Sequence, residues 1–162
     1  MYTPTIRQLT RKKIIGMRIK SSVANDKTVE LWRGFMPRRN EIQQKVSSDF
    51  FSMQVYPPNF NFQNLDVTTE FEKRAGVEVH NFDEVPVDME TFVIDEGLYA
   101  VFNYKGNSNQ AASFFQYIFT RWLPSSGYDL DNRVHFEILG EKYKNNDSES
   151  EEEVWIPIRT KE

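Results

Sequence analysis

Apolar residues follow the same order of patterns in the two halves of the chain, and this repetition constrains the fold most. Each half holds an alternating segment, then a segment with helical spacing, then two more alternating segments. Alternation with period two indicates strands that bury one face, whereas apolar residues three and four apart indicate an amphipathic helix. The expected strands cover 13–20, 50–56, 67–79, 89–94, 98–104, 134–140 and 153–159, and the expected helices begin near 25–26 and at 109, the second ending at 122.

Punctuating residues set the expected ends of these elements. The pair Asn25-Asp26 offers an N-cap to the first helix. Pro37 should kink that helix or split it near Met36, because proline lacks the N–H and clashes with the preceding turn. Pro124 should end the second helix. Gly76 suggests a bulge within the long strand 67–79.

The pattern as a whole predicts an α+β fold in a single domain covering residues 1–162. Two tandem strand-helix-strand-strand units, at about 12–82 and 87–160, would form an antiparallel sheet with two helices. A central cleft between such duplicated halves is a natural place for a ligand.

Composition and charge exclude several classes of function. The chain has no cysteine, so disulfides, thiolate metal sites and cysteine nucleophiles are ruled out. The net charge of −4 does not suit a free-standing nucleic-acid binder. We find no signal peptide and no apolar segment of membrane-spanning length, and therefore expect a cytoplasmic protein that contacts neither membrane nor nucleic acid directly.

Several spaced segments of the second half carry a more specific signal, and two segments of the first half agree with it less strictly. They are GLYAVF at 97–102 with Lys105-Gly106, WLPSSGY at 122–128, HFE at 135–137 and VWIPI at 154–158, and in the first half IIGMRIKSS at 14–22 and Leu31-Trp32. Together they resemble the GyrI-like domain, also called the AraC-type effector-binding domain, over about residues 12–160.

The resemblance implies the duplicated fold with its cleft, and a range of functions. Many members follow a DNA-binding helix-turn-helix and sense drugs, often lipophilic cations, whereas others stand alone and bind gyrase, sequester toxins or resemble hydrolases. Only about a dozen residues precede the first expected strand, so we expect the stand-alone form without its own DNA-binding domain. One departure from the family is Val134, where a proline would be expected after the segment 130–133.

Glu137 is the main candidate for a ligand-binding residue. Alternation in 134–140 directs Phe136 and Ile138 toward the helix-packed core and Glu137 the other way, together with His135. In the family the matching glutamate lies at the floor of the cleft, where an organic cation can neutralise it. The alternative is an exposed glutamate on the solvent face of a strand.

Aromatic side chains are the candidates for the walls of the cleft. Aromatics make up 14% of the chain, and their faces attract cations. Each of them could equally be an ordinary core residue. The wall candidates are Trp32, Phe35, Tyr56, Tyr99 and Trp155.

Other constellations are weak. The two histidines, His80 and His135, form no metal-binding spacing, and no nucleophile elbow or phosphate-binding glycine loop is present, so we expect neither metal nor cofactor. His80 should be exposed, and His135 could hydrogen-bond near Glu137.

We favour a non-catalytic module that binds a lipophilic, cationic, drug-like molecule through Glu137 and the wall candidates. The alternatives are a small-molecule hydrolase, with Glu137 as general base and Tyr99 or Tyr56 as proton partner, and a protein that binds gyrase or sequesters a toxin. Homo-oligomerisation and a protein partner such as gyrase or a transcription regulator stay open.

Overall fold

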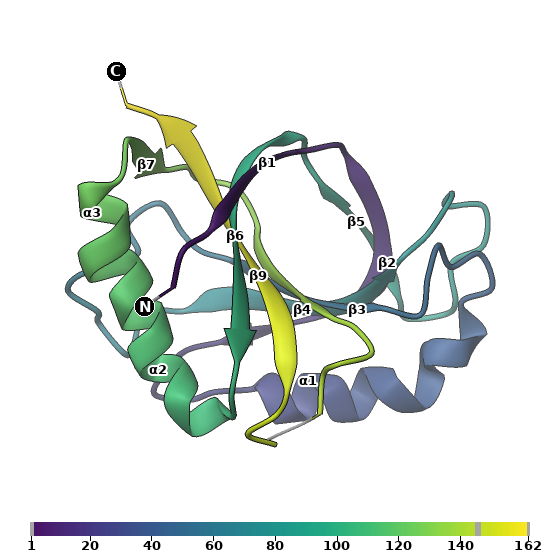
Figure 1. The fold of residues 1–162 in the computed structure, drawn as a ribbon. Coiled ribbons are helices and arrows are strands. Elements are labelled where there is room, and N and C mark those ends of the chain that lie inside the picture. The colour runs from purple at the N-terminus through teal and green to yellow at the C-terminus, as the bar shows by residue number, and fades with distance from the viewer. Residues whose placement is uncertain (1, 145–146, 162) are drawn as a thin grey trace.

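The computed structural model describes residues 2–144 and 147–161. Within these residues nine strands form one sheet in which every pairing is antiparallel, and helices pack on the sheet (Figure 1), so the α+β prediction is confirmed. The strands are β1 Thr5–Leu9, β2 Lys12–Ser21, β3 Phe50–Val55, β4 Phe71–Glu78, β5 Glu90–Ile94, β6 Gly97–Lys105, β7 Tyr128–Leu130, β8 His135–Leu139 and β9 Glu151–Thr160. The helical segments are α1 Thr28–Phe35, η1 Met36–Glu41, α2 Ser108–Tyr117, η2 Ile118–Trp122 and α3 Leu123–Ser125.

The order of strands in the sheet is symmetric about its middle. The sheet runs β1-β6-β9-β8-β3-β4-β2-β5, and β7 pairs with β9 outside this path. The trio β2-β4-β3 of the first half therefore meets the trio β6-β9-β8 of the second half through the pair β3–β8. This order is what two copies of one unit would produce, although the duplication itself stays a prediction.

Close backbone approach explains the glycine in β4. The prediction of a bulge at Gly76 was wrong, because β2 and β4 pair without interruption and place Gly16 opposite Gly76. A Cβ atom at Gly16 would collide with the backbone of Ala75. The two glycines therefore allow the strands to pair closely. The strand also begins later than expected, at Phe71, because residues 67–68 form a turn.

The first helical region begins and divides close to the expected residues. Helix α1 starts at Thr28, with Lys27 rather than Asn25 or Asp26 at the N-cap. Asp26 still contacts the start of the helix, because its carboxylate accepts a hydrogen bond from the Thr28 N–H at 2.9 Å. Pro37 lies in the first turn of η1, where its missing N–H is tolerated, so the predicted split is confirmed.

The second helical region runs further than expected. Asn107 caps α2 and forms a capping box with Gln110. The chain then continues through the wider π-helical turn η2 and ends at Ser125, so Pro124 does not stop the helix where we expected. Pro124 lies in the first turn of α3, a position that needs no N–H donor.

The two faces of the sheet pack against different partners. One face forms an all-strand core that includes Phe136 with Ile138 packed against it. On the other face, α2 packs over β6 and β9, and α1 over β2 and β4, through two further cores. Our assignment of Phe136 and Ile138 to the helix-packed core was therefore wrong. Glu137 is on the helix-covered face, because its cross-strand partner Val154 belongs to the core under α2.

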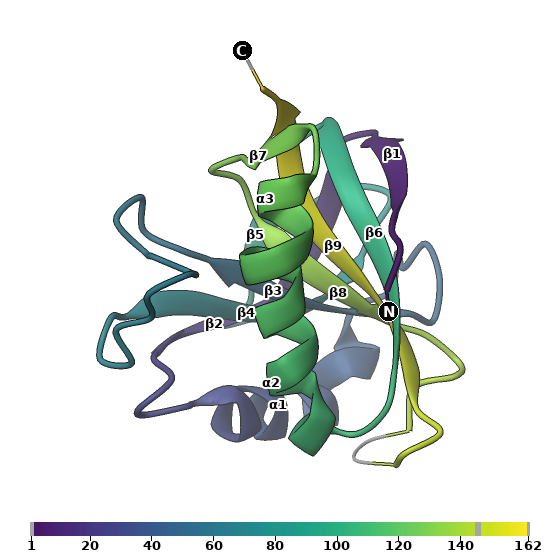
Figure 2. The same cartoon turned by 60° about the vertical axis from the view of Figure 1, so that its left-hand side comes forward.

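The two helices cover opposite ends of the same face and leave its middle open. Figures 1 and 2 show α1 and the α2–α3 segment as separate bodies against the curled sheet. Strands β3 and β8 therefore present their helix-side residues to the space between the helices. No helix in the described part of the chain has the length and apolar character needed to cross a bilayer.

Candidate ligand-binding site

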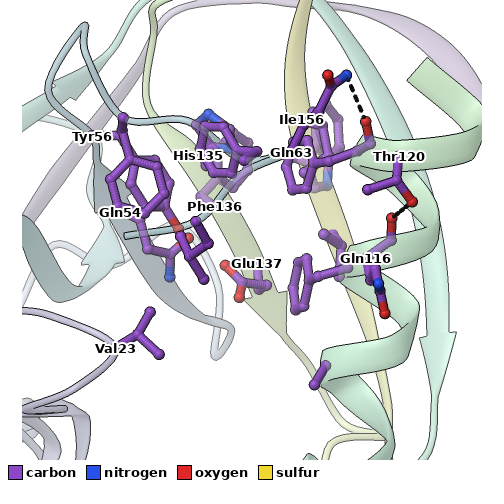
Figure 3. A pocket seen from close by; sticks show the side chains of 18 residues that line it. Val23, Gln54, Tyr56, Gln63, Gln116, Thr120, His135, Phe136, Glu137 and Ile156 are labelled. Atoms are coloured by element: carbon purple, nitrogen blue, oxygen red, sulfur yellow. Dashed lines mark hydrogen bonds between the residues drawn. The ribbon is translucent and has the colours of Figure 1, made fainter. Parts of the chain in front are cut away.

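A cavity of about 520 Å³ lies over β3 and β8, between the two helix-covered regions. Its size is within the range of small-molecule sites. One wall is α2 with η2, and the other is the loop between β3 and β4, with Val23 at the edge (Figure 3). The lining residues are Val23, Gln54, Tyr56, Phe60, Phe62, Gln63, Leu65, Ala112, Phe115, Gln116, Phe119, Thr120, His135, Phe136, Glu137, Val154, Trp155 and Ile156.

Polar side chains form a small grid at the floor of the cavity. In the register of β3 and β8, Ser52 is opposite Glu137, and Gln54 is opposite His135. Directly opposed residues share a face and have Cβ atoms about 5 Å apart. The Gln54 amide donates to the Ser52 hydroxyl at 3.5 Å. Polar groups from both halves of the chain therefore converge where the halves meet.

The Glu137 carboxyl is desolvated. Burial raises its pKa above the ordinary 4.5, and the nearby Lys73 charge and the Gln54 side chain offset this only in part. The side chain is half-buried because it opens into the cavity. The alternative of a glutamate on a solvent-exposed strand face is excluded by this position.

A second carboxyl lies near the first. Glu152 is on β9, two residues from Val154, the partner of Glu137, and so faces the same side of the sheet. Burial, together with the Glu137 charge, raises the pKa of Glu152 to about 8, and the Lys73 charge opposes this shift. Two such carboxyls oppose each other's ionisation, whereas the nearby Lys73 charge favours the ionised form of both.

An aromatic cluster forms the wall around the floor. The Tyr56 ring lies 4.6 Å from Phe60 and 4.8 Å from Phe62, measured between centroids. Phe62 stacks on Phe119 of η2 at 4.3 Å and on His135 at 5.3 Å. The stacked rings therefore hold the β3–β4 loop against η2. These faces offer the cavity a surface that attracts both apolar groups and cations.

His135 is held neutral inside this cluster. Burial, and to a smaller degree the Arg133 charge, lower its pKa to about 3. In the described part of the chain its ring makes no side-chain hydrogen bond, so the expected contact with Glu137 is not formed. His80, by contrast, is exposed as expected.

Three of the six predicted site residues reach the cavity. Glu137, Tyr56 and Trp155 are among its lining residues. Trp155 contributes little ring surface, because its indole stacks on Phe136 at 5.2 Å in the all-strand core. What these residues bind stays a prediction.

The other three pack elsewhere. Phe35 and Trp32 belong to α1 and pack in the core between this helix and the sheet. The Trp32 ring lies 6.0 Å from Phe35 and 6.2 Å from Phe50. Tyr99 is buried in the all-strand core, where its hydroxyl donates to the Val134 carbonyl at 2.7 Å. Tyr99 and Glu137 are therefore on opposite faces of the sheet, and the proposed acid–base pairing between them is not present.

Several lining residues were not assigned to the site from the sequence. They are Phe60 and Phe62 of the β3–β4 loop, and Phe115 and Phe119 of the second helical region. Large apolar rings within a loop otherwise rich in asparagine were the available signal, since such rings need a surface to cover. Among the described residues, no group of three acidic or histidine side chains could hold a metal ion.

Comparisons with known proteins place this geometry in a family. The model of the GyrI-like small molecule binding domain matches residues 2–159. The transcriptional regulator BrlR of Pseudomonas aeruginosa is 31% identical over 147 residues, which are 90% of this chain and 51% of the regulator. The chain thus spans about half the length of this curated relative.

Solved structures of low sequence identity share the fold. The C-terminal domain of EcmrR has a TM-score of 0.72 at 13% identity, with 99% of each chain covered. The structure of SAV2435 bound to tetraphenylphosphonium has a TM-score of 0.63 at 13% identity, covering 98% of this chain and 94% of the other.

Proposed function

This chain belongs to the GyrI-like small molecule binding domain family, and on that premise we propose that its cavity binds a hydrophobic organic cation. The observation that carries the proposal is the Glu137 carboxyl, desolvated at the floor of a hollow lined by aromatic rings. The Gln54 side chain and the Lys73 charge offset the cost of desolvating this carboxylate only in part, and a bound cation would reduce the remaining cost by pairing with it.

The rings around the carboxylate support the same kind of ligand. Each aromatic face that meets a cation contributes about 0.5–2 kcal/mol, and an apolar ligand body gains further from leaving water. Phe62 and Phe119 come from opposite walls and stack on each other at 4.3 Å, so they form one continuous aromatic surface against which a flat or multi-ring ligand can lie. The tetraphenylphosphonium held by SAV2435 is a ligand of this chemical class.

The regulator relative supports a sensing role. BrlR is a transcriptional regulator, and this chain corresponds to about half of it. We propose that ligand occupancy of this module is read by a transcription regulator, either within a longer chain or as a partner.

Glu137→Gln tests the proposal directly. The substitution keeps the shape and removes the charge, so the affinity for tetraphenylphosphonium should fall by about 1–3 kcal/mol, or roughly 5- to 150-fold. Isothermal titration calorimetry at pH 8 measures it. Glu141→Gln is the matched control, because Glu141 is exposed outside the cavity. Equal affinity of wild type and Glu137→Gln would refute the proposal.

A second proposal is hydrolysis of a small electrophile. It is favoured by the upward shift of the Glu137 pKa, since a carboxylate with a raised pKa is a stronger base. Tyr56 is the tyrosine of the wall, and would replace Tyr99 as proton partner. A turnover screen with small esters and strained-ring substrates separates the two proposals: turnover that Glu137→Gln abolishes supports catalysis, and its absence beside tight cation binding supports sensing.

A further inference from the structure

His135 is a buried polar side chain without a partner. Only 5% of its surface is exposed, and it lines the cavity. Its imidazole makes no hydrogen bond within residues 2–144 and 147–161. Its ring nitrogens are not among the described buried atoms that lack a partner, so they are open to the cavity and can pair with a polar group of a ligand there.

Ring contacts fix how His135 is presented. The imidazole is stacked on Phe62 at an interplanar angle of 21°, and the Tyr56 ring meets it edge-on at 4.8 Å. These ring contacts hold the imidazole in place but form no hydrogen bonds with its two nitrogens. Because the imidazole is neutral, it offers one donor and one acceptor.

The spacing between His135 and Glu137 defines what a ligand must carry. The two residues are i and i+2 on β8 and face the same side, which separates their Cβ atoms by about 7 Å. Gln54 is directly opposite His135 and adds an amide to the same end of the floor. When the charged atom of a ligand lies at Glu137, a polar group on the next fused ring of that ligand would therefore lie beside His135.

We propose that His135 is a specificity-determining residue of this cavity, which hydrogen-bonds to a polar group of an aromatic cation whose charge lies at Glu137. The inference rests on the proposed cation-binding function and narrows its ligand class. The site prefers aromatic amines and N-heterocycles that carry N–H groups over onium ions whose charge is surrounded only by carbon.

Two planar dyes of equal charge test this preference. Proflavine carries N–H donors on its amino groups and ring nitrogen, whereas N-methyl acridine orange has the same three-ring cation with every nitrogen methylated. Wild type should bind proflavine about tenfold more tightly, the effect of one good hydrogen bond. His135→Phe keeps a flat ring among Tyr56, Phe62 and Phe119, and should remove about tenfold of the proflavine affinity while changing the methylated dye less than about twofold.

Controls and contrary outcomes separate the role of His135 from the cation-binding function on which it rests. His80→Phe makes the same substitution at the other histidine, which is exposed, and should change neither affinity. An equal loss for both dyes in His135→Phe, or no loss for either, overturns the role of His135. Should the variant fail to fold in a thermal melt, equal wild-type affinities for the two dyes would overturn it instead. If neither dye binds wild type, or if Glu137→Gln weakens neither, the failure lies in the proposed function itself.

Discussion

At Glu137 and Glu152 the fold keeps two carboxyl groups on one side of the sheet, on the neighbouring strands β8 and β9. Both have raised pKa values, chiefly through burial. At neutral pH a bound cation therefore competes with protons for this end of the cavity. We expect cation affinity to fall on acidification at pH values above 4.5, the ordinary pKa of glutamate, and Glu137→Gln to flatten that dependence. Calorimetric titrations between pH 8 and pH 5 measure it, and affinity independent of pH would argue against a desolvated carboxylate as the binding group.

The same pKa shift makes stability depend on pH in a definite direction. Because Glu152 holds its proton up to about pH 8 in the folded state but only to about 4.5 when unfolded, the folded state binds more protons in this window. The contribution is full below pH 4.5 and is lost as the pH rises toward 8. Glu152→Gln should therefore raise the free energy of unfolding at pH 8.5 by roughly 1–4 kcal/mol while changing it little at pH 4.

Urea unfolding at the two pH values measures this difference, and Glu149→Gln, at an exposed glutamate of the adjoining loop, is the control. A Glu152→Gln variant that gained nothing at high pH would mean that the carboxyl is solvated.

Tyr99 provides a residue-scale test of the boundary of the site. Its hydroxyl donates to the Val134 carbonyl in the all-strand core, away from the cavity. Tyr99→Phe should cost about 0.5–1.5 kcal/mol of stability and leave the affinity for tetraphenylphosphonium unchanged. Tyr56→Ala, by contrast, should weaken the binding of tetraphenylphosphonium roughly threefold or more, because it removes a cation–π contact. Weaker binding in Tyr99→Phe would place that residue in the site after all.

Among the elements, β2 and β4 depend on a pair of glycines. Gly16→Ala would drive a Cβ atom into the Ala75 backbone, so we expect a loss of about 2–4 kcal/mol of stability. Gly34→Ala in α1 is the matched control, because a Cβ there meets nothing closer than the Met17 Sδ at 3.9 Å. That substitution should stabilise by about 0.5–1 kcal/mol through helix propensity. Thermal and urea unfolding measure both, and a tolerated Gly16→Ala would contradict the close pairing of these strands.

The sequence predicts the elements that carry a run of buried residues and misses those that are mostly exposed or too short to show a period. Strand β6 was expected at 98–104 and covers 97–105, because its alternate residues enter two cores. Strand β1 was missed, since its first four residues are exposed and it is held mainly by backbone pairing to β6. The strand β7 packs Tyr128 and Leu130 against the core under α2, but its three residues are too few to show a period.

The residues of the site likewise differ in whether the sequence could identify them. Glu137 was singled out because the family resemblance places the matching glutamate at the floor of the cleft, and Tyr56 because it is an aromatic residue with a polar atom. Phe60 and Phe62 could not be assigned, since their position depends on how the β3–β4 loop folds back onto η2 and not on any local period. Tyr99 was misassigned because alternation tells which residues share a face but not which face carries the cavity.

In the whole molecule, the curled sheet separates a structural side from a binding side. The all-strand core packs against one face, whereas the two helices on the other face cover its ends and leave β3 and β8 exposed to a cavity. The carboxyl, the imidazole and the amide at its floor come from the two strands that join the halves of the chain. A ligand held there touches both halves at once, so binding should stabilise the folded molecule as a unit.

A crystal structure of the chain grown with tetraphenylphosphonium tests the central claim most directly. We predict that the phosphonium lies in the cavity over β3 and β8, with its phenyl rings against Phe62, Phe115 and Phe119 and its charge toward the Glu137 carboxylate. A cation bound elsewhere on the surface, or a cavity closed by repacked side chains with the cation absent, would contradict the account.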